Sequence, residues 1–173
     1  VGSGQAADAV GLLRTLVQAK PPPEILAGAH YYLGVCASMT NGSAVAETEW
    51  RGVMADHAAT PYASLAAMEL GAMKQKTGAP ASEVMALYRT AAEGAASSNV
   101  AAEAWFRLGD LAYAGGVYDV SAEAYGHLLR EHPDHPRAAE AKLQAGWSWY
   151  HTGLAAEALK LAAGAPKDGK DAD

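Results

Sequence analysis

"AWFRLGDLAYAGGVYDVSAEAYGHLLREHP", residues 104–133, contains two amphipathic segments separated by a pair of glycines. The first segment carries Trp105 and Leu108 among apolar residues whose spacing places them on one face of an α-helix. Gly115-Gly116 ends this segment, because glycine tolerates the left-handed conformation that is common at helix ends. The second segment stops before a proline, which cannot continue a helix. The stretch therefore predicts a helical hairpin.

The Leu-Gly pair of this hairpin recurs along the chain at a near-constant distance. The four glycines are Gly34, Gly71, Gly109 and, in an Ala-Gly pair, Gly146; they are 37, 38 and 37 residues apart. A second glycine follows each after seven or eight residues. Each Leu-Gly glycine lies inside a predicted helix, where glycine costs about 1 kcal/mol relative to alanine. Its recurrence predicts that a neighbouring helix packs too closely at this point for a side chain.

The hairpin resembles the tetratricopeptide repeat, whose pattern is W-x2-L-G-x2-Y, then A-x3-F, then P. Trp105, Leu108, Gly109, Tyr125 and Pro133 fall on that pattern. Two positions depart from it, since the sequence has alanine in place of the tyrosine and serine in place of the alanine. The resemblance extends over nearly the whole chain of 173 residues.

This resemblance implies an all-α, right-handed TPR-like solenoid of stacked helical hairpins with about nine helices. We expect one domain over residues 1–165, made of a half repeat and four repeats, followed by a disordered tail at 166–173. The expected boundaries are 4–21 for the half repeat and about 27–58, 64–97, 102–133 and 139–165 for the repeats.

The links between repeats are longer than is usual for the family, as in "REHPDHPRAAEAKLQAG", residues 130–146. Such links resemble those of periplasmic Tol–Pal-associated proteins and of outer-membrane-assembly lipoproteins of bacteria. That resemblance favours a periplasmic or cell-envelope location, while a cytoplasmic location stays open. Because the chain begins with Val1, we expect it to be a piece of a longer protein whose missing part would provide any membrane association.

Composition excludes several classes of partner. The formal charge of −6 and a pI near 5.5 speak against nucleic acid, which is bound largely through Lys and Arg. No apolar run approaches the ~20 residues that a membrane-spanning helix needs.

The six histidines and the single cysteine are the residues of this sequence that could hold a metal or act as a nucleophile. His132 and His135 flank a proline turn, which is a poor platform for the converging ligands of a metal site. Cys36 has no neighbouring base in the sequence that would activate it. We therefore expect no enzyme activity, no metal and no cofactor. The alternatives are a metal-binding or enzymatic helical domain that uses His132, His135 and His151, or a self-association module.

The resemblance also implies a binding groove, because in this family the first helix of each repeat lines a concave face. The corresponding positions form the expected groove, at Tyr31, Val35, Met68, Phe106, Asp110, Tyr113, Leu143, Trp147 and Tyr150. Tyrosine and tryptophan suit such surfaces, since they combine a large apolar area with a polar group. We expect a protein-interaction scaffold that holds a peptide or partner protein in this groove, within a bacterial envelope assembly.

Overall fold

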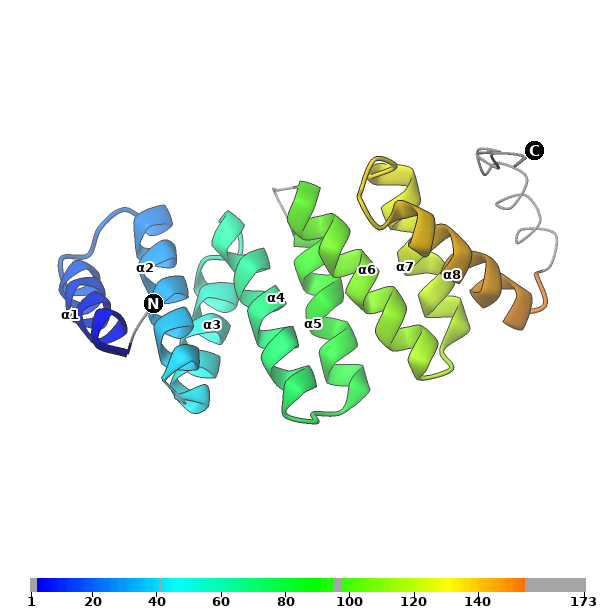
Figure 1. The fold of residues 1–173 in the computed structure, drawn as a ribbon. Helices are drawn as coiled ribbons and strands as arrows, with labels where there is room; N and C mark the ends of the chain where they lie inside the picture. Colours follow the sequence, from blue (N-terminus) through cyan, green and yellow to red (C-terminus); the bar gives the residue numbers. More distant parts are fainter. Residues whose placement is uncertain (1–2, 41, 95–97, 155–173) are drawn as a thin grey trace, which may run out of the picture. The chain divides into compact units, whose positions relative to one another are not determined.

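The structure, a computed structural model, describes residues 3–40, 42–94 and 98–154 (Figure 1). All regular structure in this part of the chain is helical. The helices are α1 (Ser3–Gln18), α2 (Pro23–Met39), α3 (Ser43–Asp56), α4 (Pro61–Lys76), α5 (Ala81–Gly94), α6 (Ser98–Ala114), α7 (Tyr118–Glu131) and α8 (Ala138–His151). The hairpins α2–α3, α4–α5 and α6–α7 overlap the ranges 27–58, 64–97 and 102–133, and α1 overlaps the range 4–21; the repeat bounds themselves stay predictions. The second helix of the fourth repeat and the tail at 166–173 lie outside the described residues.

Glycine and proline set the limits of these helices as the sequence indicated. Pro23 and Pro61 occupy the first turns of α2 and α4, where a missing N–H costs no helical hydrogen bond. Gly116 follows α6 with φ of 74°, and the N–H of Val117 donates to the carbonyl of Ala112 at 2.9 Å. This arrangement ends the helix because glycine adopts the left-handed conformation without a steric penalty.

The helices fall into two compact units, residues 1–104 and 105–173, with the division inside α6. In the first unit α1 packs on α2, α2 on α3, α3 on α4 and α4 on α5, and α2 also contacts α4. Figure 1 shows α2–α3 and α4–α5 as antiparallel hairpins. The prediction of a single domain over residues 1–165 is not tested by this division and stays a prediction.

The core of the first unit is built around a buried tryptophan. Trp50 of α3 is 1% exposed, and its indole N–H donates to the carbonyl of Tyr31 at 3.2 Å. Its buried neighbours come from α2, α3, α4 and α5: Ala27, Tyr31, Ala46, Val53, Ala66, Leu70 and Leu87. Four successive helices thus share one apolar core.

The second unit has its own core, in which Tyr125 of α7 is fully buried. Its ring packs edge-on against Phe106 of α6, with the ring centres 5.6 Å apart. Trp105, which is 3% exposed, stacks on the ring of His127 at 4.3 Å. These contacts join α6 to α7, and α7 in turn packs on α8.

Three of the Leu-Gly glycines support the close helix packing that the repeat predicted. A Cβ atom added at Gly71 would lie 2.8 Å from the ring of Tyr88, and one at Gly109 would lie 2.7 Å from the ring of Tyr125. A Cβ atom at Gly34 would clash with the indole of Trp50. In each hairpin an aromatic ring of the second helix therefore rests on the glycine of the first, and the prediction is confirmed at these positions.

Candidate functional site

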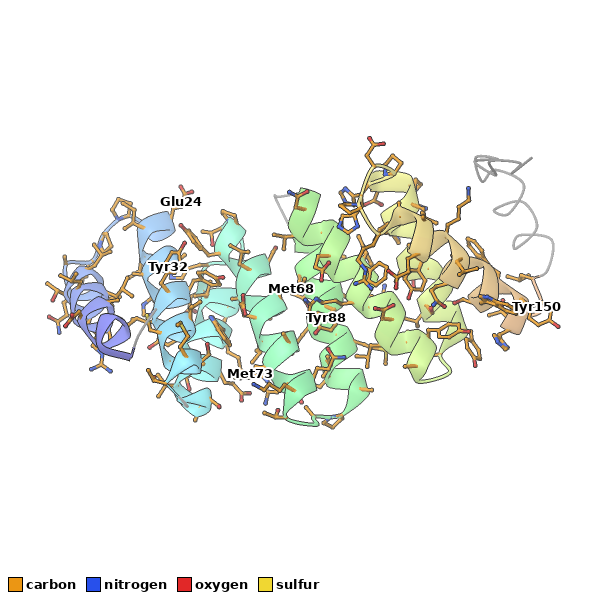
Figure 2. The ribbon with its side chains drawn as sticks, viewed as in Figure 1. Glu24, Tyr32, Met68, Met73, Tyr88 and Tyr150 are labelled. Carbon is orange, nitrogen blue, oxygen red and sulfur yellow. The ribbon has the colours of Figure 1, made fainter. Side chains whose placement is uncertain are left out.

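The exposed face of α8 carries large apolar side chains along one line. Leu143, Trp147 and Tyr150, the α8 stripe, are 61%, 50% and 61% exposed. Their spacing of four and three residues places them on one side of the helix, and Figure 2 labels Tyr150 near the C-terminal end of α8. The rings of Trp147 and Tyr150 meet edge to face, with their centres 5.9 Å apart. All three were expected groove residues, and they lie on the open surface.

Phe106 was expected in the groove, but its side chain is not on the surface. It is 0% exposed, with its ring against Tyr125 and the guanidinium of Arg137 3.4 Å from its ring centre. Arg137 precedes α8, so the start of the next repeat covers the preceding one. This residue stabilises the second unit and offers no open surface to a partner.

Asp110 and Tyr113, the other expected groove residues of α6, are partly exposed. The hydroxyl of Tyr125 donates to Asp110 Oδ1 at 2.6 Å, and Arg137 lies 3.7 Å from Asp110 Oδ2. Burial, with this hydrogen bond, raises the pKa of Tyr125. The ring of Tyr113 meets the ring of Tyr118 edge-on at 5.6 Å. Asp110 therefore already has partners within the unit, whereas Tyr113 adds aromatic surface beside α8.

The first unit carries an aromatic surface on α2 and α4, the tyrosine cluster of Tyr31, Tyr32 and Tyr62. The ring centres of Tyr31 and Tyr32 are 5.1 Å apart, those of Tyr31 and Tyr62 are 5.7 Å apart, and those of Tyr32 and Tyr62 are 6.3 Å apart. Tyr32 is 50% exposed, and Figure 2 shows it on α2. Burial, followed by the negative charge of Glu69, raises the pKa of Tyr31 to about 12.

The expected groove residues of this unit are more buried than the groove hypothesis required. Tyr31 is only 8% exposed and belongs to the core, and Val35 is partly buried against that core. Met68 of α4 is partly exposed. Tyr31 thus contributes mainly to packing, because it is buried in the apolar core of the first unit.

Sequence reasoning missed three exposed or partly exposed aromatic and apolar residues beside these surfaces. Ile25 and Tyr32, seven residues apart on α2, are each 50% exposed. Tyr62 completes the tyrosine cluster from α4. The seven-residue spacing along α2 was the signal that could have identified Ile25 and Tyr32, since such residues share one side of a helix.

The histidines do not form a metal site within the described residues. No group of three or more His, Cys, Asp or Glu side chains in residues 3–40, 42–94 and 98–154 could hold a metal ion together. The ring of His135 accepts a long hydrogen bond of 3.4 Å from the N–H of Arg137, just before α8. His151 stacks on Tyr118 at 4.3 Å. None of the helices described here is long and apolar enough to cross a membrane.

Comparison with known proteins identifies the fold. No protein-family model matches the chain, and no curated protein matches its sequence. Two crystal structures of MamA match with TM-scores of 0.62 at 18% identity; they cover 91% and 92% of this chain and 85% and 80% of their own. A third MamA structure matches with a TM-score of 0.61 at 20% identity, over 98% of this chain and 86% of its own. The predicted fold class, an all-α TPR-like solenoid, is confirmed.

Proposed function

We propose that this chain is a protein-interaction scaffold that holds a peptide or partner protein on the first helices of its hairpins. The observation that carries the proposal is the α8 stripe, where three large apolar side chains are each at least half exposed on one line of one helix. The buried cores of the two units are filled by other residues, so among the residues that the structure describes the stripe lies outside the core of the second unit. Exposed apolar groups that gather in one place are typical of interaction sites.

The composition of the stripe fits recognition rather than catalysis. Tryptophan and tyrosine contribute most to binding energy at protein interfaces, because a rigid ring buries much area at a small entropic cost. The MamA structures share the fold with this chain, and solenoids of this kind present extended surfaces on which aligned repeat positions meet one ligand. We propose that the chain performs no chemistry of its own.

The longer links between repeats support a place in the bacterial envelope. Their resemblance to periplasmic Tol–Pal-associated and outer-membrane-assembly proteins leads us to propose that the scaffold acts in the periplasm. Fractionation of the native cells tests this location, because a periplasmic protein is released when osmotic shock opens the outer membrane. Retention with cytoplasmic markers would contradict it.

Photo-crosslinking in the native cells tests the binding surface. A photoreactive amino acid is placed at Leu143 in the α8 stripe or, as a matched control, at Glu123, an exposed residue of α7. We expect a discrete crosslinked partner from Leu143 and none from Glu123. Trp147→Ala should reduce the crosslinking yield at least about tenfold, because an aromatic anchor that becomes buried in the complex contributes about 2 kcal/mol of binding energy. The helical content should stay unchanged. Equal products from both positions would contradict the proposal, and so would a product from Leu143 that contains only this chain.

A further inference from the structure

We propose that five aromatic rings at one end of the second unit bind a proline-rich segment of the partner in the extended polyproline II conformation. This inference rests on the proposed function and names the chemistry of the partner on part of the same surface. The rings, together called the five-ring surface, belong to Tyr113, Tyr118, Trp147, Tyr150 and His151.

Three helices contribute to the five-ring surface. Tyr113 lies in the last turn of α6, Tyr118 begins α7, and the other three rings lie in the last turns of α8. The rings of Tyr118 and His151 stack with their centres 4.3 Å apart, and the ring of Tyr113 meets that of Tyr118 at 5.6 Å. The ring of Tyr150, labelled in Figure 2, meets those of His151 and Trp147 at 5.8 and 5.9 Å. Each ring therefore contacts another, and the five form one connected surface.

This surface is distinct from the core of the second unit. Trp147, Tyr150 and His151 are exposed, and the two tyrosines from α6 and α7 are partly exposed. The buried rings of the unit, Phe106 and Tyr125, are both 0% exposed. A partner can thus reach the five-ring surface without opening the core.

Most neighbouring rings of the surface stand at steep angles to one another. The planes of Trp147 and Tyr150 meet at 89°, and those of Tyr150 and His151 meet at 73°. The rings of Tyr113 and Tyr118 meet at 71°. Rings at such angles give a stepped surface rather than a flat one. Rigid, apolar proline rings pack against surfaces of this kind, and aromatic residues line the sites that bind proline-rich segments in other proteins.

The polar groups of the surface are hydrogen-bond donors that the described part of the chain leaves without a partner. The hydroxyls of its three tyrosines and the indole N–H of Trp147 make no hydrogen bond with a described residue. The buried rings differ, since the indole N–H of Trp50 donates to a carbonyl and the hydroxyl of Tyr125 donates to a carboxylate. A polyproline II segment has no internal hydrogen bonds and its prolines lack an N–H, so its free polar groups are carbonyl oxygens. The surface therefore offers donors where this ligand offers acceptors.

The same donors make other apolar ligands less suitable. A helical ligand satisfies most of its carbonyls internally, so it would cover these donors without pairing them, and an unpaired buried donor is costly. An extended peptide without proline brings its own N–H groups, for which the surface offers only hydroxyl oxygens. A proline-rich segment is also extended before it binds, so it loses little conformational entropy on a small surface.

A pair of synthetic peptides tests the inference on the full chain. One consists of five Ala-Pro-Pro units, and the other, an apolar control of equal length without proline, consists of five Ala-Leu-Ser units; both have blocked ends. Binding is followed by NMR through the indole N–H signals of the tryptophans, with Trp147→Phe used to assign the Trp147 signal. We expect the proline peptide to shift this signal saturably and to bind at least about fivefold more tightly than the control.

Variants of Tyr150 localise the effect. Tyr150→Ala should weaken binding of the proline peptide at least about fivefold, and Tyr150→Phe, which removes only the donor, at least about twofold. Leu12→Ala, which removes an exposed apolar side chain from the first unit, should leave binding unchanged. Circular dichroism checks that each variant keeps its helical content.

Three results would overturn the inference: equal affinity for the two peptides, a Trp147 signal that does not move, or unchanged affinity in both Tyr150 variants. The proposed function is judged separately by crosslinking at Leu143 in cells, so the two can fail independently.

Discussion

Adding one methyl group at Gly109 should destabilise the second unit, although alanine is the better helix former. An added Cβ would lie 2.7 Å from both Cε1 and Cζ of Tyr125, closer than Cβ contacts in proteins normally allow. The ring cannot move aside easily, because it is 0% exposed and its hydroxyl is held by Asp110 at 2.6 Å. Gly126 of α7 is the matched control, since no described atom lies within 4 Å of an added Cβ there.

Two opposing effects set the magnitude. Replacing glycine by alanine inside a helix stabilises by about 1 kcal/mol. Overpacking a core costs about 1–3 kcal/mol. The upper half of that range applies here, because the ring of Tyr125 is buried and its hydroxyl is hydrogen-bonded to Asp110. We therefore expect Gly109→Ala to lower the free energy of unfolding by about 1–2 kcal/mol, and Gly126→Ala to raise it by about 0.5–1 kcal/mol.

Urea unfolding followed by far-ultraviolet circular dichroism measures both variants. The midpoints should move in opposite directions with unchanged slopes, because neither change alters the surface exposed on unfolding. Combining Gly109→Ala with Tyr125→Leu should cost less than the sum of the two single changes, since the smaller side chain relieves the clash. If Gly109→Ala raised the midpoint as much as Gly126→Ala does, the aromatic ring would not rest on this glycine and the reasoning would be refuted.

Three further outcomes are expected. Trp105→Ala should lower the free energy of unfolding by about 3–5 kcal/mol, because it empties a buried site; a loss below about 1 kcal/mol in urea unfolding would place that ring outside the core. Tyr125→Phe should cost about 1 kcal/mol because it removes the hydrogen bond to Asp110, and an unchanged urea midpoint would show that this bond does not contribute to stability. Stability contributed by neutral Tyr31 should be intact below about pH 10 and lost as the pH rises through about 12. An absorbance titration should show late ionisation of Tyr31 and of Tyr125; the pKa of Tyr31 should fall in Glu69→Gln, and the absence of any late tyrosine would contradict this.

The limits of the described helices could be predicted from the sequence because the signals involved are local. A glycine in the left-handed conformation, such as Gly116, or a proline in a first turn, such as Pro61, acts on its own few residues whatever packs around them. The glycine of each Leu-Gly pair carried information about the tertiary structure as well. This glycine recurs with the repeat because an aromatic ring of the second helix packs against it in each of these hairpins, as Trp50 packs against Gly34.

Which aromatic side chains are exposed was decided only by the tertiary structure. Phe106 and Leu143 occupy the same position of successive repeats, 37 residues apart, yet one is 0% exposed and the other 61% exposed. Arg137 lies over Phe106 at the start of the next repeat, and no described residue covers Leu143 in the same way. Likewise, Tyr31 is buried and the adjacent Tyr32 is exposed, because α4 packs on only one side of α2. The repeat pattern assigns a residue to a position, but its exposure depends on the neighbouring helix, which lies dozens of residues away along the chain.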